Sequence, residues 1–190
     1  YVLENPVQVT DTGPRDFSQQ NKLVYCGRLT EEKGVLLVAE AARDAAIPVL
    51  FVGDGPSRAA ILAANPNAEV TGWLGREEVR RRIAAESLAV IAPSRWPETG
   101  PLVVAEALAA GIPAIVSDRA GAASRIRHGV NGFVTIPDRA SIAAAVTQLR
   151  SDGMAEKLGA NAYRLYWDNP PSLENHTREL LKIYNQMLQS

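Results

Sequence analysis

The sequence has few residues of the kinds that bind metals or cross-link chains. Its 190 residues include one cysteine and two histidines. Cys26 has no partner for an internal disulfide and lies in an apolar, strand-like run, so we expect a buried, inert thiol. This cysteine usage fits the reducing conditions of a cytoplasmic protein. His128 and His176 lie far apart without companion ligands, which gives no zinc-site pattern.

Long apolar runs and an excess of either charge are also absent. No run approaches the roughly 18 residues that a membrane-spanning helix needs. The net charge is −1, with 20 Lys and Arg against 21 Asp and Glu, which implies no general attraction to nucleic acid. The apolar content of 46% and charged content of 22% are ordinary for a globular protein. The length suffices for one domain with a full core.

The best-known cofactor motifs are missing as well. Residues 53–58 begin like the dinucleotide fingerprint, but Arg58 stands where the last glycine is required. There is no Walker loop, no readable Ser/His/Asp set and no Asp-x-Asp pair for a metal-bound diphosphate. We therefore expect neither a cofactor nor a metal.

Short apolar runs alternate with helical segments along the chain. The expected strands are residues 23–26, 49–52, 69–71, 88–92, 114–117 and 133–135, and the expected helices are 35–46, 57–64, 76–86, 101–110, 121–127, 139–151, 153–166 and 173–188. The strands are continuous apolar runs, which is typical of a parallel sheet covered on both faces. The sequence predicts an α/β domain around a mostly parallel six-stranded sheet.

Two carboxylates, Glu98 and Glu106, mark the stretch around which we organise the chain. Pro101 is placed to open a helix as its first residue, and Gly111 is placed to end it. This predicts a buried helix over 101–110. Glu106 is the one charge inside it, and a lone buried carboxylate is costly unless it is paired or bonded to a ligand.

The start of this helix is a candidate anion site. The N–H groups of Gly100, Leu102 and Val103 are expected to be free, at the positive end of the helix dipole. A diphosphate there would have Glu98 on one side and Glu106 roughly 7 Å along the helix, at about 1.5 Å per residue. A nucleotide-sugar has this layout, with a sugar, a diphosphate and a ribose in line. The structural alternative pairs Glu106 with an arginine and leaves Glu98 exposed and idle.

Two basic residues, Arg28 and Lys33, follow the first expected strand. Ligands of parallel sheets bind beyond the carboxyl ends of the strands, so both residues can reach such a ligand. A guanidinium grips a phosphate with two hydrogen bonds, and a lysine adds a mobile charge. The alternative makes them ordinary loop charges, with Lys33 balanced by Glu31 and Glu32. The charges of helix 76–86 are interpreted as a solvated face.

A set of short motifs occurs in one order from about Asn5 to the last helix. They are Gly27-Arg28-Leu29 with Glu32-Lys33-Gly34, Val52-Gly53-Asp54-Gly55-Pro56, Gly72-Trp73-Leu74, Glu98 seven residues before Glu106, Ala109–Ile115, Ser117-Asp118 and Gly129–Phe133. In this set the chain resembles the carboxyl-terminal, donor-binding domain of a retaining glycosyltransferase of the GT-B fold, in the large family four (glycosyl transferases group 1). The resemblance implies a Rossmann-like, three-layer domain.

The resemblance also implies roles for individual residues. Arg28 and Lys33 would hold the donor diphosphate, Glu98 would lie near the transferred sugar, and these three would carry the catalysis. Glu106 would bond the ribose hydroxyls. The remaining expected donor contacts are Gly100, Leu102 and Val103 through their backbone, Thr99 beside them, and Gly27, Gly53, Gly72 and Leu74 toward the base. The chain departs from the family pattern at Gly100-Pro101, often Phe-Gly, at Ala120-Gly121, usually Gly-Gly, and at Ser124, often Glu.

The family places its acceptor site in an amino-terminal domain of similar size. We therefore expect residues 1–21 to connect to that missing domain, 22–169 to bind the nucleotide-sugar, and 170–190 to form a helix that crosses back. An isolated chain of this kind would bind a nucleoside diphosphate sugar but transfer nothing. We expect it in the cytoplasm, and the missing domain would be the route for any peripheral membrane association. The rival hypotheses are a non-catalytic nucleotide-binding module and a sugar-nucleotide epimerase of the same architecture.

Overall fold

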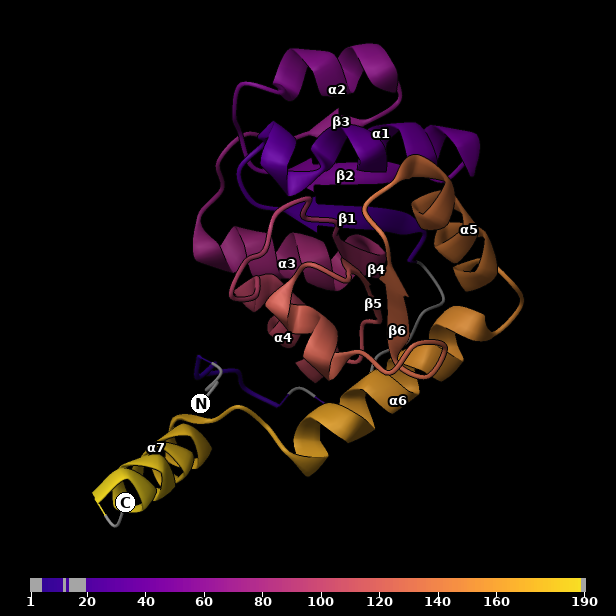
Figure 1. The fold of residues 1–190 in the computed structure, drawn as a ribbon. Coiled ribbons are helices and arrows are strands. Elements are labelled where there is room, and N and C mark those ends of the chain that lie inside the picture. The colour runs from indigo at the N-terminus through magenta and orange to yellow at the C-terminus, as the bar shows by residue number, and fades with distance from the viewer. Residues whose placement is uncertain (1–4, 12, 14–19, 189–190) are drawn as a thin grey trace.

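A computed structural model describes residues 5–11, 13 and 20–188 (Figure 1). One sheet holds six strands: β1 Lys22–Cys26, β2 Val49–Val52, β3 Glu69–Val70, β4 Ser87–Ala92, β5 Ala114–Ser117 and β6 Gly132–Thr135. Their order is β3-β2-β1-β4-β5-β6, and every neighbouring pair is parallel. The predicted six-stranded sheet and α/β class are confirmed. Part of the predicted connecting segment, residues 1–4, 12 and 14–19, lies outside the described residues.

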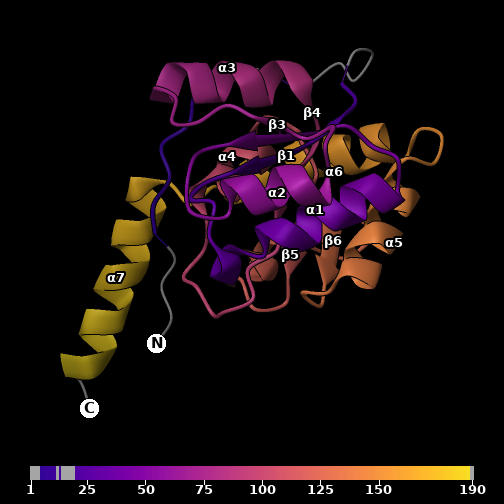
Figure 2. The same ribbon diagram turned by 90° about the horizontal axis from the view of Figure 1, so that it is seen from above.

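Helices cover both faces of the sheet (Figure 2). They are α1 Val35–Asp44, α2 Arg58–Ala64, α3 Arg76–Glu86, α4 Leu102–Ala109, α5 Arg139–Leu149, α6 Met154–Asp168 and α7 Leu173–Leu188, with 3-10 turns η1 Glu31–Lys33 and η2 Gly121–Arg125. Successive strand residues point to opposite faces. Leu23 and Tyr25 join a core cluster with α1 and α5, whereas Val24 joins a second cluster with α3 and α4. Both faces are therefore buried, which explains why the strands are continuously apolar.

Several helix ends differ from the predicted ones. Pro101 lies just outside α4, with φ −69° and ψ 123°, so its prediction as the first helical residue was wrong by one position. The ring sets only φ, and the extended ψ keeps this residue in the loop. The predicted end at Gly111 is confirmed by its φ of +72°. The expected helix 121–127 is the shorter 3-10 turn η2, and α1 ends at Asp44, short of residue 46.

The described part of the amino-terminal segment lies beside α6 and the loop that follows it. The Val7 N–H donates to the Pro171 carbonyl at 2.8 Å, and the Tyr163 hydroxyl donates to Asp11 Oδ1 at 2.7 Å. Ser172 caps the last helix, because the Asn175 N–H donates to Ser172 Oγ at 3.1 Å. The last helix, α7, projects away from the sheet (Figure 1), and none of its residues is buried.

Within the described chain, no helix is long and apolar enough to cross a membrane.

Candidate functional site

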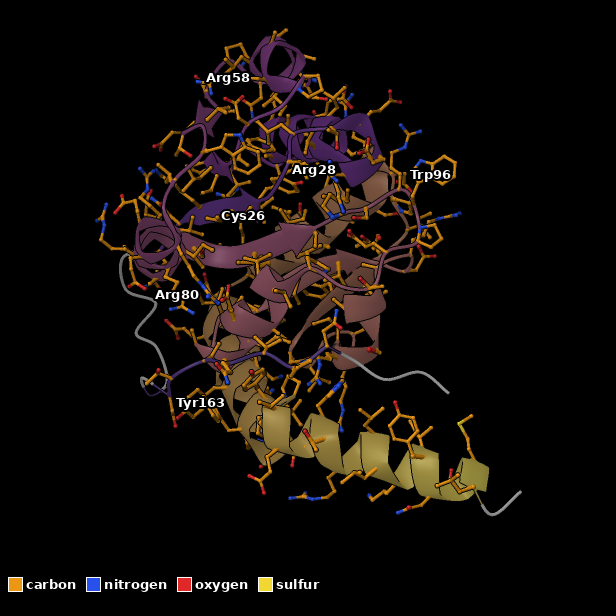
Figure 3. The ribbon with its side chains drawn as sticks, turned by 90° about the vertical axis from the view of Figure 1, so that its left-hand side faces the viewer. Cys26, Arg28, Arg58, Arg80, Trp96 and Tyr163 are labelled. Atoms are coloured by element: carbon orange, nitrogen blue, oxygen red, sulfur yellow. The ribbon has the colours of Figure 1, made fainter. Side chains whose placement is uncertain are left out.

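The strand order creates a topological switch point at the carboxyl ends of β1 and β4. These strands are neighbours, but the chain leaves β1 toward α1 on one face and leaves β4 toward α4 on the other. Ligands of doubly wound sheets bind where the connections diverge in this way. Figure 3 faces this edge of the sheet and labels Arg28 and Trp96. The loops that follow these two strands are residues 27–34 and 93–101, and we call the region between them the crevice.

Glycines allow the loops at this edge to lie in backbone contact. A Cβ on Gly53, where φ is +145°, would lie 2.0 Å from the Gly27 carbonyl oxygen. The Gly27 N–H in turn donates to the Val52 carbonyl at 3.0 Å. Gly53 also forms an isolated bridge with Gly72, so the two loops predicted to surround a base lie together. The packing accounts for Gly27 and Gly53 without a ligand, and their donor contacts stay a prediction.

Lys33 and Glu98 form an ion pair across the crevice. Lys33 Nζ donates to Glu98 Oε2, and Ser94 Oγ donates to Glu98 Oε1. Only 19% of the Glu98 side chain is exposed. Glu98 is therefore neither exposed nor idle, and Lys33 is paired with Glu98 instead of with the adjacent Glu31 and Glu32. The structural alternative was therefore wrong about the exposure of Glu98, and Lys33 has Glu98 as its ion-pair partner while its charge also acts on Glu32.

Ser94 is not among the predicted site residues, yet it fixes the loop that carries Glu98. Its side chain is buried, and its carbonyl accepts a hydrogen bond from Ser117 Oγ at 2.7 Å. The signal in the sequence is a hydroxyl directly after Pro93 at the end of an apolar strand, four residues before Glu98.

The same loop is joined to the loop after β5. The Gly121 N–H donates to the Glu98 carbonyl at 2.8 Å, and Glu98 bridges to Ala120. A Cβ on Gly121 would lie 2.3 Å from the Thr99 carbonyl oxygen. The glycine that this chain keeps in the Ala120-Gly121 pair is thus the one that the backbone contact requires.

Arg28 extends from the loop after β1 and is exposed. Its guanidinium forms no ion pair and no hydrogen bond to any residue that the structure describes. The Tyr25 hydroxyl donates to its carbonyl at 2.7 Å and so anchors its backbone. Burial, together with the Glu98 charge, raises the pKa of Tyr25, so this hydroxyl stays a donor.

The start of α4 keeps unpaired backbone donors. Among the described residues, no carbonyl accepts from the N–H of Gly100, Leu102 or Val103, whereas the Val104 N–H donates to the Pro101 carbonyl at 3.0 Å. These three groups are the predicted anion donors. They are free as expected, and the anion itself stays a prediction.

Glu106 lies on α4 opposite two arginines of α3. Arg76 and Arg80 each approach Glu106 Oε1 at 3.6 Å, too far for a good hydrogen bond. Most charges of helix 76–86 are solvated as predicted, for example Glu77 at 90% and Arg81 at 65% exposed. Arg76 and Arg80 in addition reach Glu106, so the structural alternative that pairs Glu106 with an arginine is confirmed. A third arginine, Arg82, is 19% exposed and pairs with Glu69. The Glu106 carboxylate accepts no hydrogen bond within the described chain, so it has ion-pair partners yet keeps its capacity to accept hydroxyl donors.

Two further predicted features lie at the same edge. Leu74 packs against the second core cluster next to α4, while the adjacent Trp73 is exposed. Cys26 is half-buried, so its predicted full burial was wrong. Burial and the nearby Glu106 charge raise its thiol pKa to about 11, in keeping with an inert thiol. Within the described residues, no three His, Cys, Asp or Glu side chains are grouped to hold a metal.

A parallel Rossmann-like sheet with basic side chains and a free helix start at its switch point defines a GT-B-type α/β domain. The chain belongs to the family Glycosyl transferases group 1, whose model matches residues 12–165. A GDP-mannose-dependent alpha-mannosyltransferase of Corynebacterium glutamicum is 32% identical over 151 residues, which are 78% of this chain and 36% of that protein. The chain spans about a third of the length of the first curated relatives it matches.

Solved structures share the fold. TarM of S. aureus, in a complex that includes UDP, has a TM-score of 0.80 at 19% identity and covers 97% of this chain and 39% of TarM. The C-terminal domain of a glycosyl transferase group 1 protein, LpcC of Francisella tularensis, has a TM-score of 0.70 at 19% identity. The match covers 78% of this chain and 85% of that domain. The predicted fold, that of the carboxyl-terminal half of a GT-B protein, is confirmed.

Proposed function

We propose that the chain is the donor-binding domain of a retaining, metal-independent glycosyltransferase. It would take a sugar from a nucleoside diphosphate sugar and pass it to a glycan, a lipid or a small molecule. The observation that carries the proposal is the ion pair between Lys33 and Glu98, which joins the loop after β1, where Arg28 also lies, to the loop that leads into the free N–H groups of α4. The retaining stereochemistry rests on the motif resemblance.

Each group of the crevice would meet one part of the donor. Arg28 and Lys33 would stabilise the charge that builds on the leaving diphosphate, with the start of α4 as a further source of positive potential. These cations could do the work that a metal ion does elsewhere. Glu98 would bond the hydroxyls of the transferred sugar, and Glu106 would bond the ribose.

The comparisons support a nucleotide-sugar donor but leave its base open. One relative is named as GDP-mannose-dependent, and the TarM structure contains UDP. Both nucleotides carry the diphosphate and ribose that the proposed contacts would bind. The base would be chosen by the loops 53–56 and 72–75.

Transfer would need a second domain that carries the acceptor. The relatives are about three times as long as the matched region, which leaves room for it. On α7 the exposed apolar side chains Leu181, Tyr184 and Leu188 would pack on that domain. The isolated chain would bind the donor without transferring sugar. The whole protein would act in the cytoplasm, and any peripheral membrane contact would be through the second domain.

Calorimetry of the isolated chain with UDP and with GDP, each with and without EDTA, tests the proposal. We expect binding of one or both nucleotides that the chelator does not change, and binding roughly 10- to 150-fold weaker in Lys33→Ala. Strict dependence on magnesium would contradict the metal-free assignment. Absence of binding by both nucleotides would contradict the donor-binding role itself.

A further inference from the structure

A concave site lies outside the crevice, beside the loop that carries Glu98. It is a groove of about 610 Å³ lined by Glu31, Glu32, Arg95, Trp96, Arg119 and Pro137. None of the residues assigned to the donor lines it. The Trp96 side chain is 68% exposed, an unusual position for so large an apolar surface. Figure 3, which faces the carboxyl ends of the strands, shows Trp96 at the periphery of the molecule and away from Arg28.

The loop that presents the indole is held firmly. The Arg95 N–H donates to the Glu32 carbonyl at 2.8 Å, and Arg95 Nη1 pairs with Glu31 Oε1 at 2.9 Å. On the other side of Trp96, the backbone of Glu98 bridges to Ala120. A ligand that lay on this indole would not have to order the loop first, and such preorganisation favours binding.

The charge of the groove differs from that of the donor crevice. Two carboxylates, Glu31 and Glu32, face two guanidinium groups, Arg95 and Arg119, so the lining is balanced. A phosphate would meet as much negative as positive charge here. A neutral ligand rich in hydroxyl groups would find both strong acceptors and strong donors. The flat indole adds an apolar face of the kind on which the C–H face of a sugar ring packs.

We propose that this groove binds a neutral sugar ring of the acceptor, with Trp96 as its stacking platform. The inference rests on the proposed function, because Trp96 precedes Glu98 by two residues. Two residues span at most about 7 Å, so a ring on Trp96 would lie next to the site that we assign to the transferred sugar. The donor-binding domain would then contribute to acceptor binding as well.

Saturation-transfer NMR on the isolated chain tests the inference, with methyl α-D-mannopyranoside, methyl α-D-glucopyranoside and an α-linked mannobiose as probes. Trp96→Ala removes the platform, and Trp96→Phe keeps an aromatic face. Tyr184→Ala is the control, because Tyr184 is an exposed aromatic residue of α7, at 54%, outside this groove and outside the donor site. We expect a saturation-transfer signal from at least one saccharide with the wild type, the Phe variant and the Tyr184 control, and loss of that signal with Trp96→Ala.

Three results would overturn the inference. The first is a saturation-transfer signal that Trp96→Ala leaves unchanged, and the second is the absence of a signal from all three saccharides with the wild type. The third is a parallel loss of UDP or GDP binding in Trp96→Ala, which would assign Trp96 to the nucleotide. Melting curves of each variant exclude a folding defect. Nucleotide titrations of the wild type test the donor site separately, so a failure of the proposed function is distinguishable from a failure of this one.

Discussion

The ion pair between Lys33 and Glu98 makes the first prediction a question of competition. A diphosphate that binds Lys33 must take it from Glu98 or share it. Glu98→Gln removes the competing charge and leaves a side chain of the same size. We therefore expect this variant to bind UDP or GDP more tightly than the wild type. The sequence alone predicts no change, because it places Glu98 at the sugar and away from the diphosphate.

The size of the gain follows from the exposure of the pair. The side chains are 28% and 19% exposed, so solvent screens their attraction. Such pairs contribute about 0.2–1 kcal/mol, and release of Lys33 should strengthen diphosphate binding by that amount, up to about fivefold. By contrast, Lys33→Ala should weaken it by about 1.5–3 kcal/mol, roughly 10- to 150-fold, because a charged hydrogen bond is lost. The two single variants thus have opposite signs.

Calorimetry of Lys33→Ala, Glu98→Gln and the double variant measures these effects at one salt concentration. In the Lys33→Ala background, the gain from Glu98→Gln should shrink, because no lysine remains to be released. Titration with GDP-mannose and UDP-glucose adds the sugar contact. Release of Lys33 affects both ligands alike, so it cancels in the ratio of donor affinity to diphosphate affinity. This ratio should fall roughly 5- to 150-fold in Glu98→Gln, which corresponds to about 1–3 kcal/mol for the lost sugar contact.

The reasoning fails if Glu98→Gln weakens the bare diphosphate as much as it weakens the donor. It fails equally if the gain persists in full without Lys33.

Three more predictions concern single residues. Arg28→Ala should weaken UDP or GDP binding by about 1.5–3 kcal/mol at an unchanged melting temperature, because Arg28 is exposed and unpaired in the described chain; Arg164→Ala on α6 is the control, and a lower melting temperature with affinity retained contradicts the role. In calorimetry, Glu106→Gln should weaken the binding of the diphosphate and of the donor by similar amounts, about 1–3 kcal/mol each. A loss confined to donor binding would place Glu106 at the sugar. Iodoacetamide should alkylate Cys26 at a rate that rises with pH to a plateau near its raised pKa of about 11; a plateau near the ordinary value of 9.0 would show an open thiol.

Local patterns predicted most of the elements to within two residues. Strands 49–52 and 114–117 and helix 76–86 have the predicted bounds, because apolar runs and charge-rich helical segments reflect interactions between near neighbours in sequence. The clustering of Arg28, Lys33 and Glu98 was also predictable, since the carboxyl ends of parallel strands meet at one edge. The family motifs added the order of the loops, and the structure places Gly53 beside Gly72 as that order implies.

Ion-pair partners could not be read in the same way. Lys33 has two carboxylates directly beside it in sequence, yet its partner is Glu98, 65 residues away. Glu106 is paired with arginines of α3 because two helices pack side by side on one face of the sheet. A charge on a long side chain pairs with whichever partner the packed backbones bring within reach, and sequence distance carries little information about that.

The amino-acid sequence by itself determined the alternation of strands and helices, the parallel sheet and the edge at which the polar loops gather. Those features follow from apolar periodicity, from glycine and proline at the turns, and from the geometry of parallel connections. The tertiary structure alone decided that Ser94 positions Glu98, that Gly121 is required by backbone contact with Thr99, and that Trp96 lies exposed over a charge-balanced groove. Each depends on contacts between loops that separate strands bring together, and such contacts exist only once the sheet has formed.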